Sequence, residues 1–96
     1  MDQKPKLLII EDDQDLVKAL EIHFTDAGYE VTTAADGGEG LRKMYQHRPD
    51  LIVLDIMLPH LDGWEVCGRI RDLSSVPIVM LTARGQEFEK VKGLQM

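Results

Sequence analysis

The residues of this sequence with the clearest potential for chemistry come directly after short apolar runs. Residues 51–54 form an uninterrupted apolar run that ends on Asp55, and residues 7–10 form another that ends on Glu11 and Asp12. Runs of this length and composition are typical of strands buried on both faces of a parallel sheet. The carboxyl ends of such strands meet at one edge of the sheet, where ligands bind. We therefore expect these carboxylates to converge.

Converging carboxylates suggest cation binding and phosphoryl transfer. Carboxylates held close together repel one another unless they take up protons or share a cation. An all-oxygen site suits Mg2+, which keeps several waters and leaves positions for phosphate oxygens. A carboxylate can also attack phosphorus to form an aspartyl phosphate. Asp55 is then the expected nucleophile, and Thr82, which follows the apolar run 78–81, is expected to face it.

The same residues also have purely structural interpretations. Asp55 could cap a turn or a following helix, and the acidic residues 11–13 could be a solvated strand end followed by a helix cap at Asp13. Taken singly, these residue types do not decide between the alternatives. Their joint placement at the ends of successive apolar runs favours the chemical interpretation.

The elements that must position these residues alternate between strand and helix. A first helix is expected from Asp13 to Gly28, an edge strand over residues 29–33, and a turn at residues 36–38. A second helix, weakened by Gly40, should end before Pro49. A third is expected between the loop 56–63 and the serines at 74–75, and a fourth near the end of the sequence. The expected apolar faces are Leu16, Val17, Leu20, Phe24 and Ala27, then Leu41, Met44 and Tyr45, then Val66, Ile70 and Leu73, and finally Phe88, Val91 and Leu94.

Composition narrows the possible partners. The 96 residues suffice for one domain, and 11 basic against 17 acidic side chains give a net charge of -6, which argues against unaided binding to nucleic acid or anionic membrane. The apolar runs are too short to span a membrane. The lone Cys67 fits a reducing, cytoplasmic compartment, and we expect it in the core. The three histidines are too scattered for a zinc site. Trp64 is expected to be half-buried, and Met44, Met57 and Met80 to serve packing.

These motifs, in this order and spacing, resemble the receiver domains of bacterial two-component response regulators. The acidic end of the first run resembles the family's metal-binding segment, and the segment from Pro49 through Asp55 to Pro59 resembles its phosphoacceptor segment. The resemblance implies a flavodoxin-like, doubly wound parallel α/β sheet of strand order 2-1-3-4, an order for which receiver domains are themselves a known example. It covers residues 1–96 and implies a receiver domain that lacks the fifth strand and fifth helix.

The resemblance also implies roles for individual residues. Asp55 would be phosphorylated by a histidine kinase, and Mg2+ would be held by Asp12, Asp55 and the backbone carbonyl of Met57, with Glu11 acting through water. Thr82 would bind a phosphoryl oxygen, and Ala83 would leave room for it. The module would be a signalling switch in transcription regulation rather than an enzyme, with at most slow self-catalysed phosphoryl transfer and dephosphorylation. A DNA-binding output domain could lie beyond this chain.

One departure from the family keeps an alternative open. The family's lysine at the end of its fifth strand is missing, since Lys90 and Lys92 are expected on a helix. A degenerate receiver that binds partners without phosphorylation therefore remains possible. Without a fifth strand, the run Ile78–Leu81 would be an open apolar sheet edge, which predicts self-association or strand exchange. An aspartate-nucleophile phosphatase would need a second acid two residues after Asp55, where this sequence has Met57. A flavin mononucleotide binder is disfavoured because the acids after the first strand would repel phosphate.

Overall fold

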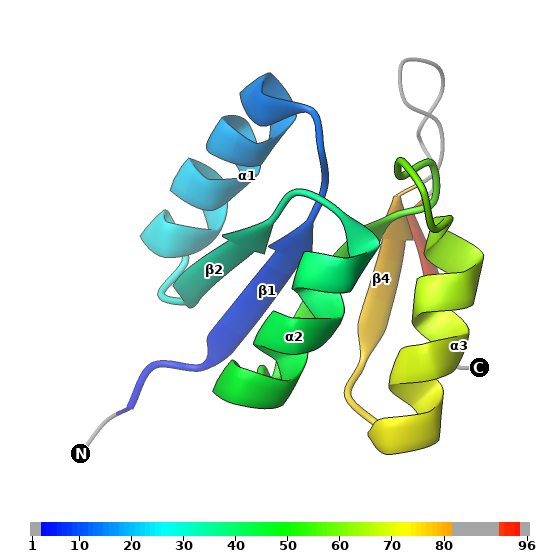
Figure 1. Ribbon diagram of the computed structural model, residues 1–96. Helices are drawn as coiled ribbons and strands as arrows, with labels where there is room; N and C mark the ends of the chain where they lie inside the picture. Colours follow the sequence, from blue (N-terminus) through cyan, green and yellow to red (C-terminus); the bar gives the residue numbers. More distant parts are fainter. Residues whose placement is uncertain (1–2, 82–90, 95–96) are drawn as a thin grey trace.

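The computed structural model describes residues 3–81 and 91–94, which form five strands and three helices. The strands lie in one sheet of order β2-β1-β3-β4-β5, and the first four are parallel, as predicted. Each helix connects two parallel strands (Figure 1). The elements are β1 Lys6–Ile10, α1 Gln14–Asp26, β2 Glu30–Ala34, α2 Gly37–His47, β3 Leu51–Asp55, α3 Gly63–Leu73, β4 Ile78–Leu81 and β5 Val91–Leu94.

Helices cover both faces of the sheet, with α1 on one side and α2 and α3 on the other (Figure 1). Successive side chains of a strand point to opposite faces. Leu7 and Ile9 of β1 therefore belong to the cluster that Leu20 and Phe24 of α1 pack against. The larger cluster, on the side of α2 and α3, has thirteen buried members: Leu8, Ile10, Ala34, Met44, Ile52, Leu54, Leu58, Val66, Cys67, Ile70, Val76, Ile78 and Met80. The sequence prediction of strands buried on both faces is confirmed, as is the core position of Cys67.

Each helix begins at an aspartate cap. The side chains of Asp13, Asp36 and Asp62 accept hydrogen bonds from backbone N–H groups in the first turns of α1, α2 and α3. The turn expected at residues 36–38 is wrong, because the cap at Asp36 lets the helix start at Gly37. After α1 the chain turns at Gly28, whose φ of +102° suits glycine. None of these described helices has the length and apolarity needed to cross a membrane.

Four side chains expected to pack are exposed instead, the first of them Ala27 at the C-terminal cap of α1. Tyr45, Met57 and Leu73 are 62, 59 and 58% exposed. The buried face of α2 consists of Gly37, Gly40 and Met44, so Tyr45, one residue on, points away from it. Met57 lies in the loop after β3, and Leu73 is the last residue of α3.

The end of the chain departs furthest from the prediction. A helix carrying Val91 and Leu94 is wrong, because Val91–Leu94 forms β5, paired antiparallel to β4. Lys92 thus lies on a strand, while Phe88 and Lys90 lie outside the described residues. The pairing gives hydrogen-bond partners to the backbone N–H and C=O groups at the edge of β4. Leaving these groups unpaired would cost more free energy than the weak helical pattern of residues 88–94 could gain. The expected open edge at Ile78–Leu81 is therefore wrong, and with it the reason for expecting self-association.

Candidate metal centre

Three carboxylates meet at the carboxyl edge of the parallel strands. Glu11, Asp12 and Asp55 each offer one oxygen, and these oxygens lie within 4.8 Å of one another. The register explains the meeting, because Ile10 pairs with Leu54 and the residues that follow both strands emerge side by side. Glu11 and Asp55 are each only 1% exposed, whereas Asp12 is partly exposed. The predicted convergence of these acids is confirmed.

Backbone amides orient two of the three carboxylates. Asp55 Oδ1 accepts a hydrogen bond from Met57 N–H at 3.0 Å, and Glu11 Oε2 accepts one from Asp13 N–H at 2.9 Å. The main chain of Glu11 is fixed as well, since its N–H donates to the carbonyl of Ala34 at the end of β2, at 3.0 Å. These donors are neutral N–H groups, so they orient the two carboxylates without cancelling their charge.

The donor chemistry of this cluster fits a hard divalent cation. All three side chains are oxygen donors, and two of them are buried, where like charges held close together repel one another more strongly than in water. A bound divalent ion removes the mutual repulsion and prefers such oxygen ligands. The partial exposure of Asp12 leaves one side of the cluster open to water. The cluster could therefore hold a metal ion.

Gly63, the first residue of α3, lets this helix rest on the backbone of the site. Its N–H donates to Ile56 O at 2.8 Å. A Cβ at this position would lie 2.4 Å from the carbonyl oxygen of Asp55 and 2.5 Å from Ile56 Cα. Only glycine allows this approach, because both obstacles are backbone atoms. The sequence showed Gly63 as a turn residue, and nothing in its spacing revealed the contact.

The loop between β3 and α3 forms one wall of an open cleft beside the carboxylates. Leu61 N–H donates to Pro59 O at 2.7 Å, and His60 between them has a φ of +67°. This is the geometry of a γ-turn with a positive central φ, which is rare and strained for a residue with a side chain. The cleft has a volume of about 580 Å³ and is lined by Asp12, Ile56, Met57, Leu58, Pro59, Asp62 and Trp64.

The structure brings together four of the predicted site residues. Glu11, Asp12 and Asp55 form the cluster, and Met57 contacts Asp55 through its backbone. Trp64 is 45% exposed, half-buried as expected, and shares the cleft with Asp12. Thr82 and Ala83 lie outside the described residues. Sequence reasoning missed Glu39 and Lys43 of α2, whose contacts are described below. The available signal was the capping-box spacing, with Asp36 three residues before Glu39.

Comparison with known proteins identifies the family. Residues 7–96 match the sequence pattern described as the response regulator receiver domain. This chain belongs to that family. A similar curated relative is the transcriptional regulatory protein AfsQ1 of Streptomyces coelicolor, which is 52% identical over 91 residues, 95% of this receiver domain but 40% of that protein. The chain thus spans well under half the length of this relative.

Solved receiver structures show the same fold. The chemotaxis response regulator CheY4 of Vibrio cholerae superimposes with a TM-score of 0.81 at 36% identity, covering 88% of this chain and 72% of that one. The complex of CheX and CheY with BeF3 and Mg2+ from Borrelia burgdorferi gives a TM-score of 0.79 at 33% identity, covering 86% of this chain and 65% of that one. The predicted flavodoxin-like receiver fold, with parallel order 2-1-3-4, is therefore confirmed.

Proposed function

We propose that this receiver domain is a phosphorylation switch in which Asp55 accepts a phosphoryl group from the phosphohistidine of a histidine kinase. The observation that carries the proposal is the placement of Asp55, a buried carboxylate at the end of the central strand β3, within 4.8 Å of the carboxylates of Glu11 and Asp12. A carboxylate oxygen of Asp55 forms the new P–O bond while the P–N bond of the donor breaks. The imidazole leaves and takes a proton from water.

Mg2+ fits this site as the cofactor. Asp12 and Asp55 would hold it directly together with the backbone carbonyl of Met57, and Glu11 would act through a water. When bound, Mg2+ neutralises charge that develops on the transferring group. The chain itself orients the acceptor, because the hydrogen bond from Met57 N–H to Asp55 Oδ1 fixes the direction of this carboxylate. The Borrelia complex, which is named for BeF3 and Mg2+ together, supports this assignment by analogy.

The chain acts as a signalling module rather than a metabolic enzyme in this proposal. Its own chemistry is limited to slow self-catalysed phosphoryl transfer and dephosphorylation. The readout is a change of shape passed to an output domain or partner, and the relative named as a transcriptional regulatory protein supports an output in DNA binding. Thr82 would contact the phosphoryl group, with Ala83 leaving it room, by the family resemblance alone.

The test is labelling by a small phosphodonor. The chain is incubated with acetyl phosphate and Mg2+, and the modified peptide is located by mass spectrometry. We expect one phosphoryl group on Asp55 and none in Asp55→Asn. Asp13→Asn is the matched control, because asparagine still caps α1 and labelling should persist. Modification of Asp12 or Asp13 instead would overturn the assignment. An absence of labelling in the wild type would favour a phosphorylation-independent interaction module.

A further inference from the structure

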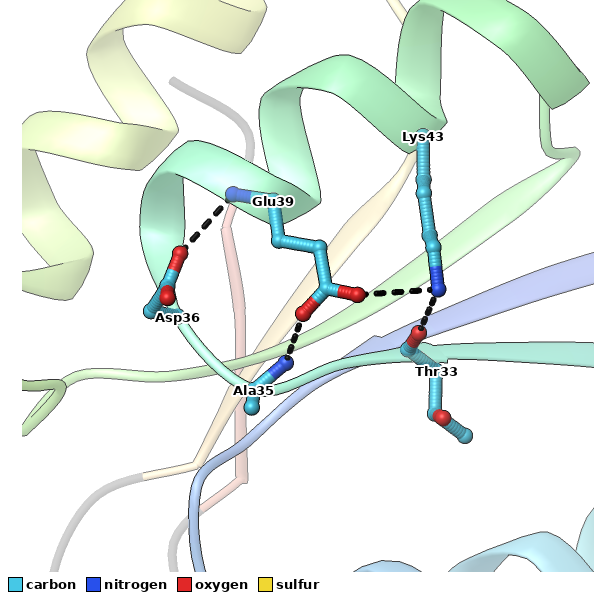
Figure 2. Close-up of polar contacts among 5 residues, drawn as sticks. All are labelled: Thr33, Ala35, Asp36, Glu39 and Lys43. Atoms are coloured by element: carbon cyan, nitrogen blue, oxygen red, sulfur yellow. Dashed lines mark hydrogen bonds and ion pairs between the residues drawn. The ribbon is translucent and has the colours of Figure 1, made fainter.

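Two charged side chains of α2 bind the main chain where β2 ends and the segment leading to α2 begins (Figure 2). Glu39 Oε1 accepts a hydrogen bond from Ala35 N–H at 2.9 Å, and Glu39 Oε2 pairs with Lys43 Nζ at 3.1 Å. Lys43 Nζ also donates to the carbonyl of Thr33 at 2.7 Å. The Ala35 amide, and after it Lys43, keep the pKa of Glu39 below its ordinary value of 4.5. We call Glu39 and Lys43 the α2 clamp.

The α2 clamp binds the main chain on both sides of Ala34, through the carbonyl of Thr33 and the N–H of Ala35. Ala34 itself is 3% exposed, and its carbonyl accepts the hydrogen bond from the N–H of Glu11, a member of the carboxylate cluster. Glu11 and both residues of the clamp also line one cavity of about 230 Å³. A shift of the Ala34 carbonyl would therefore move the main chain of Glu11 and, with it, a carboxylate of the cluster.

A second pair with the same spacing shows that the clamp is more than a surface ion pair. Glu65 and Arg69 of α3 are also four residues apart and also 3.1 Å apart, but their side chains are 52 and 56% exposed. Those of Glu39 and Lys43 are each 30% exposed. An exposed pair contributes little, whereas a charge-assisted bond to a partly buried backbone carbonyl fixes geometry.

We propose that Glu39 and Lys43 are positioning residues for the metal centre, which act by fixing the Ala34 carbonyl and through it the place of Glu11. This inference rests on the proposed function, since it assumes that the cluster binds Mg2+. Neither residue touches the ion. The effect is on Mg2+ affinity in the folded protein, in the way that partners of metal ligands tune a site.

The experiment compares Lys43→Met with Arg69→Met in the full chain. Calorimetric titration with Mg2+ should show an affinity about tenfold weaker for Lys43→Met, at the lower end of the effects of such partners, and unchanged for Arg69→Met. Lys43→Arg, which keeps the charge and the donors, should recover most of the loss. If the clamp only stabilised the fold, Lys43→Met would lower the free energy of unfolding and leave the Mg2+ affinity of the folded protein unchanged.

Hydrogen exchange gives an independent readout. The Glu11 amide should exchange faster in Lys43→Met, while the Ile52 amide, which donates to Pro77 O, should keep its rate. A Mg2+ affinity of Lys43→Met within twofold of wild type, or an unchanged exchange rate of the Glu11 amide, would overturn the inference. If wild type bound no Mg2+, the proposed metal site itself would fail, and the exchange of the Glu11 amide would still decide whether the clamp holds this main chain.

Discussion

Replacing Gly63 by alanine tests the contact between α3 and the site most directly. The new Cβ would lie 2.4 Å from Asp55 O, whereas ordinary contacts begin near 3.4 Å, so the helix must retreat by about 1 Å. Overpacking of this kind costs about 1–3 kcal/mol, and weakening the Gly63 N–H bond to Ile56 O adds about 1 kcal/mol. We expect Gly63→Ala to lower the free energy of unfolding by roughly 2–4 kcal/mol, out of a total of about 5–15 kcal/mol for domains of this kind.

Gly68 of the same helix provides the matched control. A Cβ there meets nothing within 4 Å, so Gly68→Ala should gain up to about 1 kcal/mol from helix propensity alone. Urea unfolding followed by circular dichroism measures both variants, and the slope of the transition checks that the unfolding remains comparable. If Gly63→Ala unfolded within about 0.5 kcal/mol of wild type, the close approach of α3 to the Asp55 carbonyl would be refuted.

Three further predictions concern the site and its supports. Mg2+ at millimolar concentration should change the fluorescence of Trp64, which shares the cleft with Asp12, and Asp12→Asn should abolish the response. Gly40→Ala should destabilise by about 1 kcal/mol in urea unfolding, because its Cβ would lie 2.5 Å from Ile10 Cδ1 and 2.9 Å from Ile10 Cγ1, and in an Ile10→Ala background, which removes both atoms, the same change should stabilise. The pKa of Glu39 is lowered by its contacts in the folded state, so its stabilisation is full above pH 4.5 and is lost as the pH falls through the lowered pKa. Glu39→Gln should therefore lower the free energy of unfolding near pH 6 and have less effect near pH 3.5.

The sequence predicted the parallel strands and the acidic cluster because both depend on strong local signals. Apolar runs bounded by acids locate β1 and β3, and the handedness of the crossovers then brings Glu11 and Asp55 to one edge. The cap at Asp13 predicts where α1 begins, and the turn residues that end the loop 56–63 place the start of α3 close to Gly63. These features follow from hydrophobic burial and backbone hydrogen bonding, which short stretches of sequence already encode.

The remaining features depend on contacts between distant segments. The reason for Gly40 lies in the side chain of Ile10, thirty positions earlier, so its effect on α2 could not be judged from helix propensity alone. The pairing of Val91–Leu94 with β4 satisfies an edge that exists only once the sheet has formed. The α2 clamp likewise joins side chains of α2 to a carbonyl near the end of β2 and to the amide that follows the strand, and the sequence does not specify that these groups lie within reach.

The antiparallel pairing of β5 with β4 makes strand addition at this edge a competition. The N–H and C=O groups of Ile78–Leu81 that face β5 can bond to one neighbour at a time. Any other strand that pairs there must first displace Val91–Leu94, whichever molecule supplies it. The apparent affinity of the incoming strand is its intrinsic affinity multiplied by the fraction of molecules in which β5 is displaced. β5 thus acts as an intramolecular competitor for the edge of β4. Variants that weaken the pairing of β5 with β4 should bind an incoming strand more tightly without any change in that strand.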